Sequence, residues 1–288
     1  MDTLVLGARG GLGTLISAEL AARGHVIRTV PREAARDANA LARAAAGCEA
    51  IVNCAGASVA LGLGKGWRGY YAVDTRIGLA AIEAAKQVGS RLVYVAVAKS
   101  PALARCAYVD AHERVAAAMG DGVVVRATGF FSAYAALLPM ARRGWLVDIG
   151  NGKTRTNPIA EYDLAEIVAD AVTGDGPREI SAGGPEVMTR AEIFEAVAAV
   201  AGRRVRMLRI PAWLGGAQAA MLRLVHPRMG QFAKFAALLA KHDCIADARG
   251  TATLRDYLEA EVGVRHELRA NSSRSANVPA NTSRSVGP

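Results

Sequence analysis

Short apolar runs alternate with longer amphipathic segments through the first half of the chain. The runs are rich in aliphatic and β-branched residues, which is typical of buried strands. Five strands are predicted: Thr3 to Leu6, Val26 to Val30, Ala50 to Cys54, Arg91 to Val97 and Val123 to Arg126. Helical spacing begins at Leu12 and continues over about 38–46, 71–88 and 108–119. Strands and helices in alternation predict an α/β fold with a doubly wound parallel sheet.

The rhythm of the chain changes after Arg126. Thr189 and Glu192 form the sequence pattern of a capping box and predict a helix that ends at Gly202. Further predicted elements are a helix over 162–172, strands over 178–182 and 205–210, and one or two apolar helices over 212–242, interrupted at His226. The C-terminal stretch that contains the capping-box helix and the apolar helices is therefore predicted to form a smaller, mainly helical domain.

A glycine-rich turn joins the first strand to the first helix. Gly7, Gly10 and Gly13 follow one another at intervals of three residues, and Gly11 is an extra glycine between them. A diphosphate approaches the backbone N–H groups at the positive end of a helix, and side chains there would block it. The place of the motif therefore favours nucleotide binding, with Leu12 beside the glycines, over a plain strand–turn–helix.

Composition limits the classes of protein that remain. The 288 residues, 52% of them hydrophobic, are enough for one large domain or two. A net charge of +9 suits an anionic cofactor, whereas nucleic-acid binding is not predicted because no aromatic residues alternate with the basic ones. No apolar run reaches the roughly 18 residues of a membrane span. The spacing of the four cysteines indicates neither a metal site nor disulfides, which is typical of a reducing compartment. The first predicted strand begins almost directly after Met1, where a signal peptide would lie. Together these two observations predict a cytoplasmic protein.

Six motifs occur in an order that is typical of one superfamily. They are Gly7-x-x-Gly10-x-x-Gly13, Asn53-Cys54-Ala55-Gly56, Val73-Asp74-Thr75, Arg126 to Phe131, Asn157-Pro158-Ile159 with Asp163-Leu164-Ala165, and Gly183-Gly184-Pro185-Glu186 with Thr189. Over residues 1 to about 265 the chain resembles the short-chain dehydrogenase/reductase superfamily in its extended or atypical branch. The short unit at 31–37 is similar to that of the dTDP-4-keto-rhamnose reductase type. Residues 108–159 look more like atypical members related to nitrogen-metabolite-repressor proteins and a respiratory complex I accessory subunit.

The resemblance implies a Rossmann-like NAD(P)-binding domain and a separate substrate domain. The predicted boundaries are 1–150, completed by parts of 151–182, for the first domain and 183–267 for the second. Residues 268–288 lack periodicity and are predicted to be a disordered tail. The resemblance also implies cofactor contacts from Ala55, Gly56, Ala57, Ala96 and Thr128.

Two arginines favour NADP(H) over NAD(H). An acidic residue usually follows the second strand and binds the ribose 2′-hydroxyl of NAD, but here the chain reads Val30-Pro31-Arg32. Arg9 adds a second cation within the glycine turn, and two guanidinium groups suit a 2′-phosphate. The alternative is that both are ordinary solvated arginines. By family analogy, Asp37 is expected to meet the adenine amino group.

The catalytic pattern of the superfamily is incomplete in this chain. Its Tyr-x-x-x-Lys motif is matched by Tyr108, the proton donor or acceptor, but His112 occupies the lysine position. A mostly neutral imidazole polarises a phenol less than lysine does, although it can still bind a ribose hydroxyl. The strand that should end in Ser or Thr reads Val95-Ala96-Val97. The alternative to a catalytic role is that Tyr108 only packs on the sheet. The alternative to a ribose contact is that His112 is a surface histidine.

Two functions remain open at this point. The first is an NADPH-dependent oxidoreductase or epimerase-like enzyme that acts on a small carbonyl substrate, with Tyr108 and His112 as its catalytic residues. The second is a non-catalytic NAD(P)-binding sensor or accessory subunit. The retained tyrosine favours the enzyme, and the missing serine and lysine favour the sensor. A monomer or a homodimer is expected.

Overall fold

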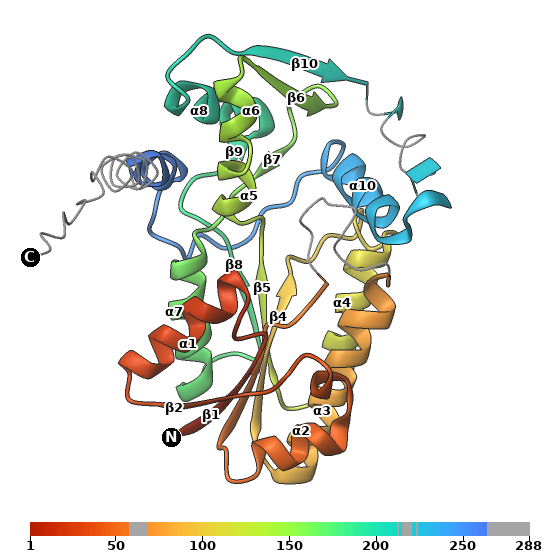
Figure 1. Cartoon of the computed structure of the whole chain (residues 1–288), viewed down its shortest axis with the longest axis vertical. Coiled ribbons are helices and arrows are strands. Elements are labelled where there is room, and N and C mark those ends of the chain that lie inside the picture. The colour runs from red at the N-terminus through yellow and green to blue at the C-terminus, as the bar shows by residue number, and fades with distance from the viewer. Residues whose placement is uncertain (58–67, 212, 215–220, 223, 264–288) are drawn as a thin grey trace, which may run out of the picture.

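A six-stranded parallel sheet forms the centre of the protein (Figure 1). The computed structural model describes residues 1–263 except 58–67, 212, 215–220 and 223. The strand order is β2-β1-β3-β4-β5-β8, and every pair in this sheet is parallel. The strands are β1 (Asp2–Leu6), β2 (Val26–Thr29), β3 (Ala50–Asn53), β4 (Arg91–Val97), β5 (Val123–Ala127) and β8 (Glu179–Ala182). The predicted doubly wound parallel sheet is confirmed.

Helices cover both faces of this sheet. Because side chains alternate along a strand, Leu4 and Leu6 pack into one core and Val5 into the other. Helices α2 (Ala38–Ala45), α3 (Arg76–Val88) and α4 (Ala107–Ala118) cover the first face, and α1 (Gly11–Ala22) and α7 (Glu161–Thr173) cover the second (Figure 1). The three layers explain why the strands read as continuous apolar runs.

The unit between β2 and β3 is as short as the sequence suggests. The structure describes every residue between these two strands, and the only elements there are a 3₁₀ turn, η1 (Ala34–Arg36), and helix α2. Strand β3 then pairs directly with β1, so the strand order reverses at β1. In open α/β sheets a ligand binds in the crevice at such a reversal, beyond the carboxyl ends of the strands.

A smaller unit lies above this edge of the sheet in Figure 1. Its centre is a parallel pair, β6 (Trp145–Ile149) with β10 (Arg206–Ile210), and its core contains Phe131, Leu146 and Phe194. The chain thus leaves the large sheet after β5 and returns to it with α7 and β8. The other elements are α5 (Phe131–Ala135), α6 (Leu138–Arg142), β7 (Arg155–Thr156), β9 (Met188–Thr189), α8 (Arg190–Val200), α10 (Pro227–Leu239) and a helix over 254–263. The domain boundaries predicted from the sequence stay a prediction.

Two helix starts in this unit follow their sequence signals. Thr189 and Glu192 bond reciprocally in the predicted capping box at the start of α8. His226 is the N-cap of α10, and its Nδ1 accepts a hydrogen bond from the backbone N–H of Met229. Of the helices within the described residues, none combines the length and the apolar character that a membrane crossing requires. The predicted tail at 268–288 lies outside the described residues.

Candidate functional site

The glycine turn after β1 brings the backbone closer than side chains would allow. Gly7 has φ +90°, a conformation that favours glycine, and a Cβ there would lie 2.9 Å from the backbone of Ala55. A Cβ on Gly13 would lie 2.1 Å from the carbonyl oxygen of Gly7. Gly11 differs, because a Cβ there would have nothing within 4 Å. Gly7 and Gly13 therefore permit the sharp turn, while Gly11 faces open space.

Helix α1 starts at this turn without a side chain over its end. Its N-cap is Gly10, which provides no side-chain hydrogen bond, and its first turn contains no acidic residue. The hydroxyl of Thr14 donates to the carbonyl oxygens of Ala8 and Gly10, so it stabilises the turn from within. The first N–H groups of a helix have no partner inside the helix and carry its positive dipole end. This end of α1 can therefore receive an anion.

The predicted ribose and adenine contacts are near the same edge. Strands β1 and β2 pair in parallel, with Val5 opposite Thr29. Arg9 and Arg32 each lie three residues beyond the carboxyl end of one of these adjacent strands. Both are exposed, and neither is in an ion pair with any residue that the structure describes. Asp37 instead caps α2, with Oδ1 accepting from the N–H of Ala40 at 2.8 Å. The adenine contact predicted for Asp37 stays a prediction.

The loop after β3 is held by the carboxylate of Asp74. Ala57 donates its N–H to both oxygens of Asp74, each at 3.2 Å. Gly56 approaches so closely that a Cβ there would lie 2.6 Å from Asp74 Oδ1. The N–H of Ala55 donates to Asn53 Oδ1. The three residues predicted to contact the cofactor thus line one ordered turn at the sheet edge.

Two other predicted contacts are buried at the ends of their strands. Thr128 follows β5, and its hydroxyl donates to the carbonyl oxygen of Asn157 at 2.6 Å. Ala96 lies in β4 and packs into the core beneath α3 and α4. The Cys54 thiol donates to the carbonyl oxygen of Leu6, and burial raises its pKa to about 12. A thiol whose pKa is raised in this way is little ionised near neutral pH, so Cys54 is a poor nucleophile.

A cluster of polar side chains lies beside this edge, between β4, α3 and α4; Asp74, Tyr94 and His112 are buried, and Tyr108 is half-buried. Tyr108 and His112 are one helical turn apart on α4, and their rings are in edge contact with centroids 5.0 Å apart. His112 Nδ1 lies 2.6 Å from the hydroxyl of Tyr94 on β4. His112 Nε2 faces Asp74 at 3.8 Å and has no hydrogen-bond partner among the described residues. Asp74 belongs to a π-helical turn, η2 (Tyr71–Thr75), which runs directly into α3.

Burial controls the charges of this cluster. It raises the pKa of Asp74 to about 7, although the N–H of Ala57 and the Arg228 guanidinium oppose the rise. It lowers the pKa of His112 to about 4, helped by the positive charge of Arg126. Near neutral pH the imidazole is therefore neutral and the carboxyl is divided between its two forms. Burial likewise raises the pKa of Tyr108, so its phenol is protonated.

The surroundings of Tyr108 are aromatic. Its ring contacts Tyr70 at 4.8 Å and Phe235 of α10 at 4.9 Å between centroids. Tyr70 is fully buried, and its hydroxyl has no hydrogen-bond partner among the described residues. The structure thus brings together both predicted catalytic residues, but His112 turns inward to Tyr94 rather than outward. Strand β4 lacks the serine or threonine that the superfamily pattern has at its end, and the first serine after it, Ser100, lies three residues beyond the strand.

The sequence did not single out Asp74, Tyr94 and Tyr70 as members of the site. Tyr94 alternates with its strand neighbours in the same way as Leu92 and Ala96, so the three side chains lie on the sheet face that α2, α3 and α4 cover. Asp74 was visible as part of a family motif, but its distance to His112 follows only from how α3 and α4 pack. Within the described residues, no three His, Cys, Asp or Glu side chains are grouped as a metal site would require.

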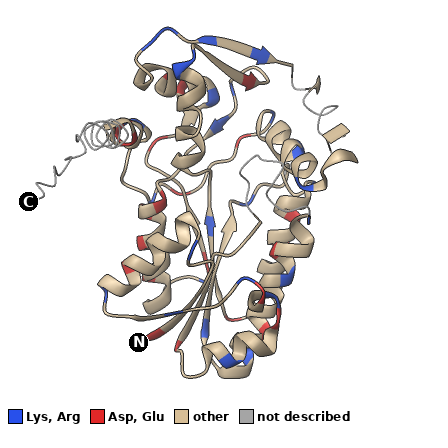
Figure 2. Cartoon of the chain, viewed as in Figure 1, with Lys and Arg blue, Asp and Glu red and all other residues tan. Residues whose placement is uncertain are grey.

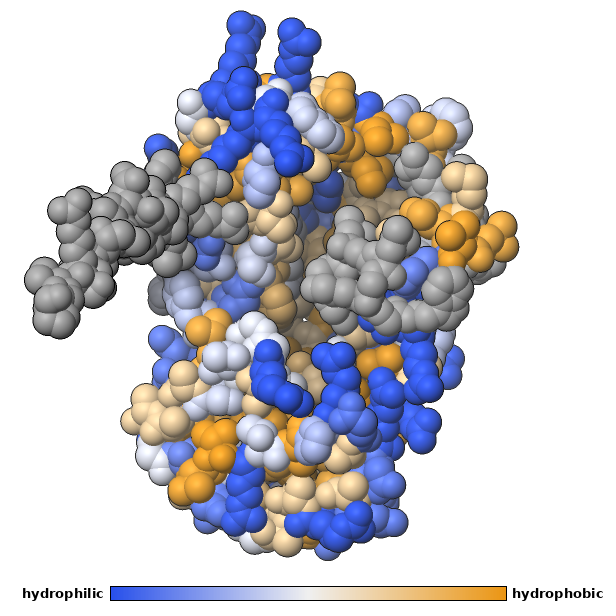
Figure 3. Space-filling model, in the orientation of Figure 1, coloured by the Kyte–Doolittle hydropathy of each residue, from blue (hydrophilic) through white to orange (hydrophobic). Residues whose placement is uncertain are grey.

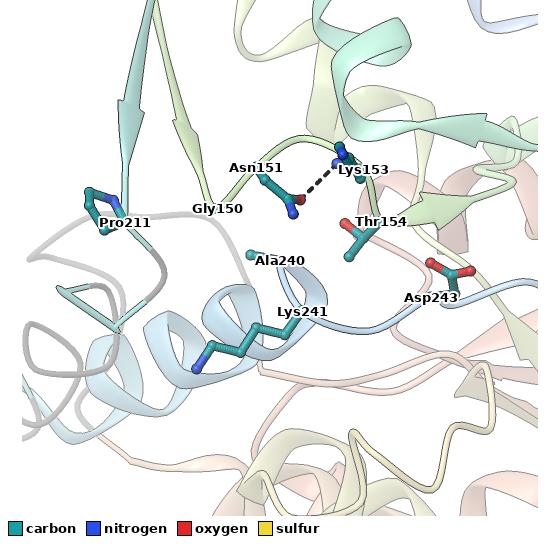
Figure 4. A pocket seen from close by; sticks show the side chains of 8 residues that line it. All are labelled: Gly150, Asn151, Lys153, Thr154, Pro211, Ala240, Lys241 and Asp243. Atoms are coloured by element: carbon teal, nitrogen blue, oxygen red, sulfur yellow. Dashed lines mark hydrogen bonds between the residues drawn. The ribbon is translucent and has the colours of Figure 1, made fainter.

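A cavity of about 650 Å³ opens between the ends of β6 and β10 and the end of α10 (Figure 4). Gly150 follows β6, Pro211 follows β10, and Ala240 follows α10, so three element ends meet there. The remaining lining residues are Asn151, Lys153, Thr154, Lys241 and Asp243. Phe235, which contacts Tyr108, is on the same helix that ends at this cavity. Figure 3 shows that this face of the molecule is hollowed between the large sheet and the small unit.

Comparison with known proteins relates the chain to solved structures. No protein-family model and no curated protein matches the sequence. Human epimerase family protein SDR39U1, solved with NADPH, has a TM-score of 0.69 at 22% identity, over 90% of this chain and 98% of that chain. A dTDP-4-dehydrorhamnose reductase of Clostridium acetobutylicum has a TM-score of 0.66 at 13% identity, over 92% and 100% of the two chains.

A third similar structure is an Escherichia coli quinone oxidoreductase. This NADPH-dependent enzyme, QOR2, was solved with NADPH and has a TM-score of 0.61 at 17% identity, over 90% of this chain and 99% of that chain. At such identities the likeness establishes the fold. The chain has a Rossmann-type fold like that of these three proteins, which confirms the predicted fold.

Proposed function

We propose that this protein binds NADP(H) at the carboxyl edge of its large sheet and reduces a small carbonyl compound there. The observation that carries the proposal is the glycine turn. Gly7 and Gly13 allow the turn, Gly11 leaves open space, and α1 begins there with no acidic residue in its first turn. A diphosphate requires this combination of close backbone approach and positive helix end.

The surroundings of the turn favour the phosphorylated cofactor. Arg9 and Arg32 leave neighbouring strands at the same edge, are exposed, and are in no ion pair with a described residue. Two such guanidinium groups can bind a 2′-phosphate in the forked geometry that lysine lacks. Three of the similar structures were solved with NADPH or NADP, namely QOR2, SDR39U1 and a dTDP-4-dehydrorhamnose reductase of Bacillus anthracis.

Tyr108 is the proton donor in this proposal. NADPH, when bound, supplies the hydride, so the protein must supply the proton to the carbonyl oxygen. Burial raises the pKa of Tyr108 and keeps the phenol protonated before the reaction, which suits a donor better than a base. His112 touches the Tyr108 ring and carries no positive charge near neutral pH. It therefore orients Tyr108 without the electrostatic help that a lysine gives.

A second candidate function is binding of the cofactor without turnover, as in a redox-state sensor or accessory subunit. One contact favours it: His112 Nδ1 is engaged by the Tyr94 hydroxyl, and the imidazole faces the protein interior. Ala96, buried in the core, supplies no hydroxyl to polarise a substrate. Cofactor binding is common to both candidates, and only catalysis separates them.

Two measurements test the proposal in sequence. Calorimetric titration with NADPH and NADH tests binding, and NADPH oxidation over a panel of aldehydes, ketones and quinones tests turnover. Tyr108→Phe is expected to abolish most turnover while cofactor binding is retained. Tyr162→Phe is the matched control, because Tyr162 is an exposed tyrosine on α7, on the opposite face of the sheet. Binding without any turnover would favour the second candidate, and absence of NADPH binding would refute both.

A further inference from the structure

The outer face of the β6–β10 pair is an uncovered apolar surface. Parallel pairing places Arg206 opposite Trp145 and Leu208 opposite Val147. Successive side chains of a strand point to opposite faces of the pair. Leu146 therefore packs into the core of the small unit, while Trp145 and Leu208 face solvent. Trp145 is 40% exposed and Leu208 is 53% exposed. A tryptophan and a leucine left in water on one sheet face indicate a surface that meets something apolar.

The chain after β10 continues this surface. Trp213 is 71% exposed, and Leu224 is 84% exposed. We define the apolar patch as Trp145, Leu208, Trp213, Met221, Leu224 and Val225, all of which are exposed. Figure 3 shows hydrophobic side chains gathered over β6, β10 and the segment that follows. The cavity adjoins the patch, because Gly150 and Pro211, which directly follow the two strands, line it.

The same part of the chain is uniformly basic. Between Glu195 and Asp243 the sequence contains no acidic residue. It contains eight basic ones: Arg203, Arg204, Arg206, Arg209, Arg223, Arg228, Lys234 and Lys241. Figure 2 shows basic residues along β10 and the loop before it. In the part of the chain that the structure describes, Arg204, Arg206 and Arg209 are in no ion pair.

We propose that the apolar patch docks the protein on the surface of an anionic lipid bilayer. Exposed tryptophans prefer the level of the lipid headgroups, where their rings are half in water and half in hydrocarbon. Leu208 and Leu224 enter the boundary of the acyl chains, as the apolar face of a peripheral anchor does. Arg206, which pairs with Trp145 on the same face, binds a headgroup phosphate. An anionic bilayer can bind the apolar and the basic side chains at the same time, whereas a nucleic acid would bind the basic side chains and leave the leucines exposed to water.

Sedimentation with vesicles tests the proposal on the full chain. The protein is mixed with vesicles of phosphatidylcholine alone and with vesicles that contain about one-third phosphatidylserine. Binding is expected only with the second kind, with a shift of tryptophan emission to shorter wavelength. Arg206→Glu should lower the partition coefficient by roughly tenfold. Trp145→Ser with Leu208→Ser should lower it comparably and reduce the emission shift.

Matched controls separate docking from folding and from cofactor binding. Leu79→Ser with Lys86→Glu changes an exposed leucine and a lysine on α3, away from the patch, and should leave vesicle binding unchanged. Thermal unfolding and NADPH titration of each variant show that the fold and the nucleotide site are intact. Failure of NADPH binding in every variant would refute the proposed function and leave the docking result valid.

Three outcomes would overturn the docking proposal. The first is equal sedimentation with neutral and anionic vesicles, or sedimentation that the patch variants do not change. The second is binding to heparin and to anionic vesicles alike without an emission shift, which would assign the surface to polyanions through charge alone. The third is a dimer in the absence of lipid that Trp145→Ser with Leu208→Ser dissociates, which would assign the patch to a second copy of this chain.

Discussion

The Tyr94 hydroxyl and His112 Nδ1 lie 2.6 Å apart, and this contact determines which way the imidazole faces. Burial raises the pKa of Tyr94 well above its usual value, so the phenol keeps its proton and can donate it to Nδ1. The ring proton of His112 is then on Nε2, toward Asp74. When Asp74 is protonated, the reverse arrangement becomes available, with Nδ1 donating to Tyr94. Tyr94 and His112 are therefore joined by one buried hydrogen bond, and the charge of Asp74, 3.8 Å from Nε2, influences which ring nitrogen of His112 carries the proton.

Removing the Tyr94 hydroxyl should destabilise the fold. Tyr94→Phe leaves the buried Nδ1 of His112 without its partner, which costs about 1–3 kcal/mol of the free energy of unfolding. Urea unfolding measures this loss. Tyr162→Phe, which removes the hydroxyl of an exposed tyrosine, should change the free energy by less than about 0.5 kcal/mol. Equal effects of the two substitutions would show that the Tyr94–His112 contact contributes nothing.

Asp74 should make stability depend on pH. Its folded pKa of about 7 lies above the usual value of 3.8, so the unfolded chain ionises first as pH rises. The stability that Asp74 contributes is thus complete below pH of about 4 and is lost as pH rises through about 7, by up to about 4 kcal/mol. Asp74→Asn removes this loss. The variant should gain stability relative to the parent as pH rises from about 4 to about 7.

The opposite contribution of His112 makes the comparison with the variant necessary. Burial lowers the pKa of His112 to about 4, so its contribution has the opposite sign and is lost as pH falls from about 6.5 to about 4. Asp110→Asn is the matched control, because the pKa of Asp110 is lowered by the hydroxyl of Tyr71. Asp110→Asn should therefore lose stability relative to the parent as pH rises. A difference for Asp74→Asn that stays constant with pH would contradict the burial of an ionisable carboxyl.

The local features of this protein could be predicted from its sequence. The runs at β1, β3, β4 and β5 are apolar because helices cover both faces of the sheet, and their limits follow within about two residues. Gly7 and Gly13 were identifiable because a sharp turn before a helix needs residues without side chains at that spacing. The Thr189–Glu192 capping box is local for the same reason.

The long-range part of the site could not be predicted in the same way. A spacing of four residues places His112 beneath Tyr108 on one face of α4, but it does not say what the imidazole meets. Its partners are Tyr94 and Asp74, which come from β4 and from the turn before α3, and only the packing of those elements brings them together. The sequence thus named the two residues on α4 and missed the network that orients them.

Substitutions of two glycines separate the fold from the nucleotide site. Gly13→Ala forces a Cβ against the Gly7 carbonyl and should cost about 1–3 kcal/mol of stability and weaken NADPH binding. Gly11→Ala meets no atom within 4 Å and should stabilise α1 by up to about 1 kcal/mol. If the diphosphate of NADPH occupies the space beside Gly11, the same methyl group weakens binding. Urea unfolding with NADPH titration measures both effects, and full binding by Gly11→Ala would place the diphosphate elsewhere.

Arg9 and Arg32 should decide which dinucleotide binds more tightly. They follow the adjacent strands β1 and β2, and neither is neutralised by an acidic side chain among the described residues. Arg9→Ala with Arg32→Ala should weaken NADPH binding by roughly ten- to hundredfold and NADH binding by less than about threefold, because only NADPH carries the 2′-phosphate. The NADPH loss should shrink at high salt, since exposed charges are screened. Arg43→Ala, which removes an exposed arginine of α2, is the control and should spare both cofactors. Equal losses for NADPH and NADH in parallel titrations would exclude a 2′-phosphate site at these two arginines.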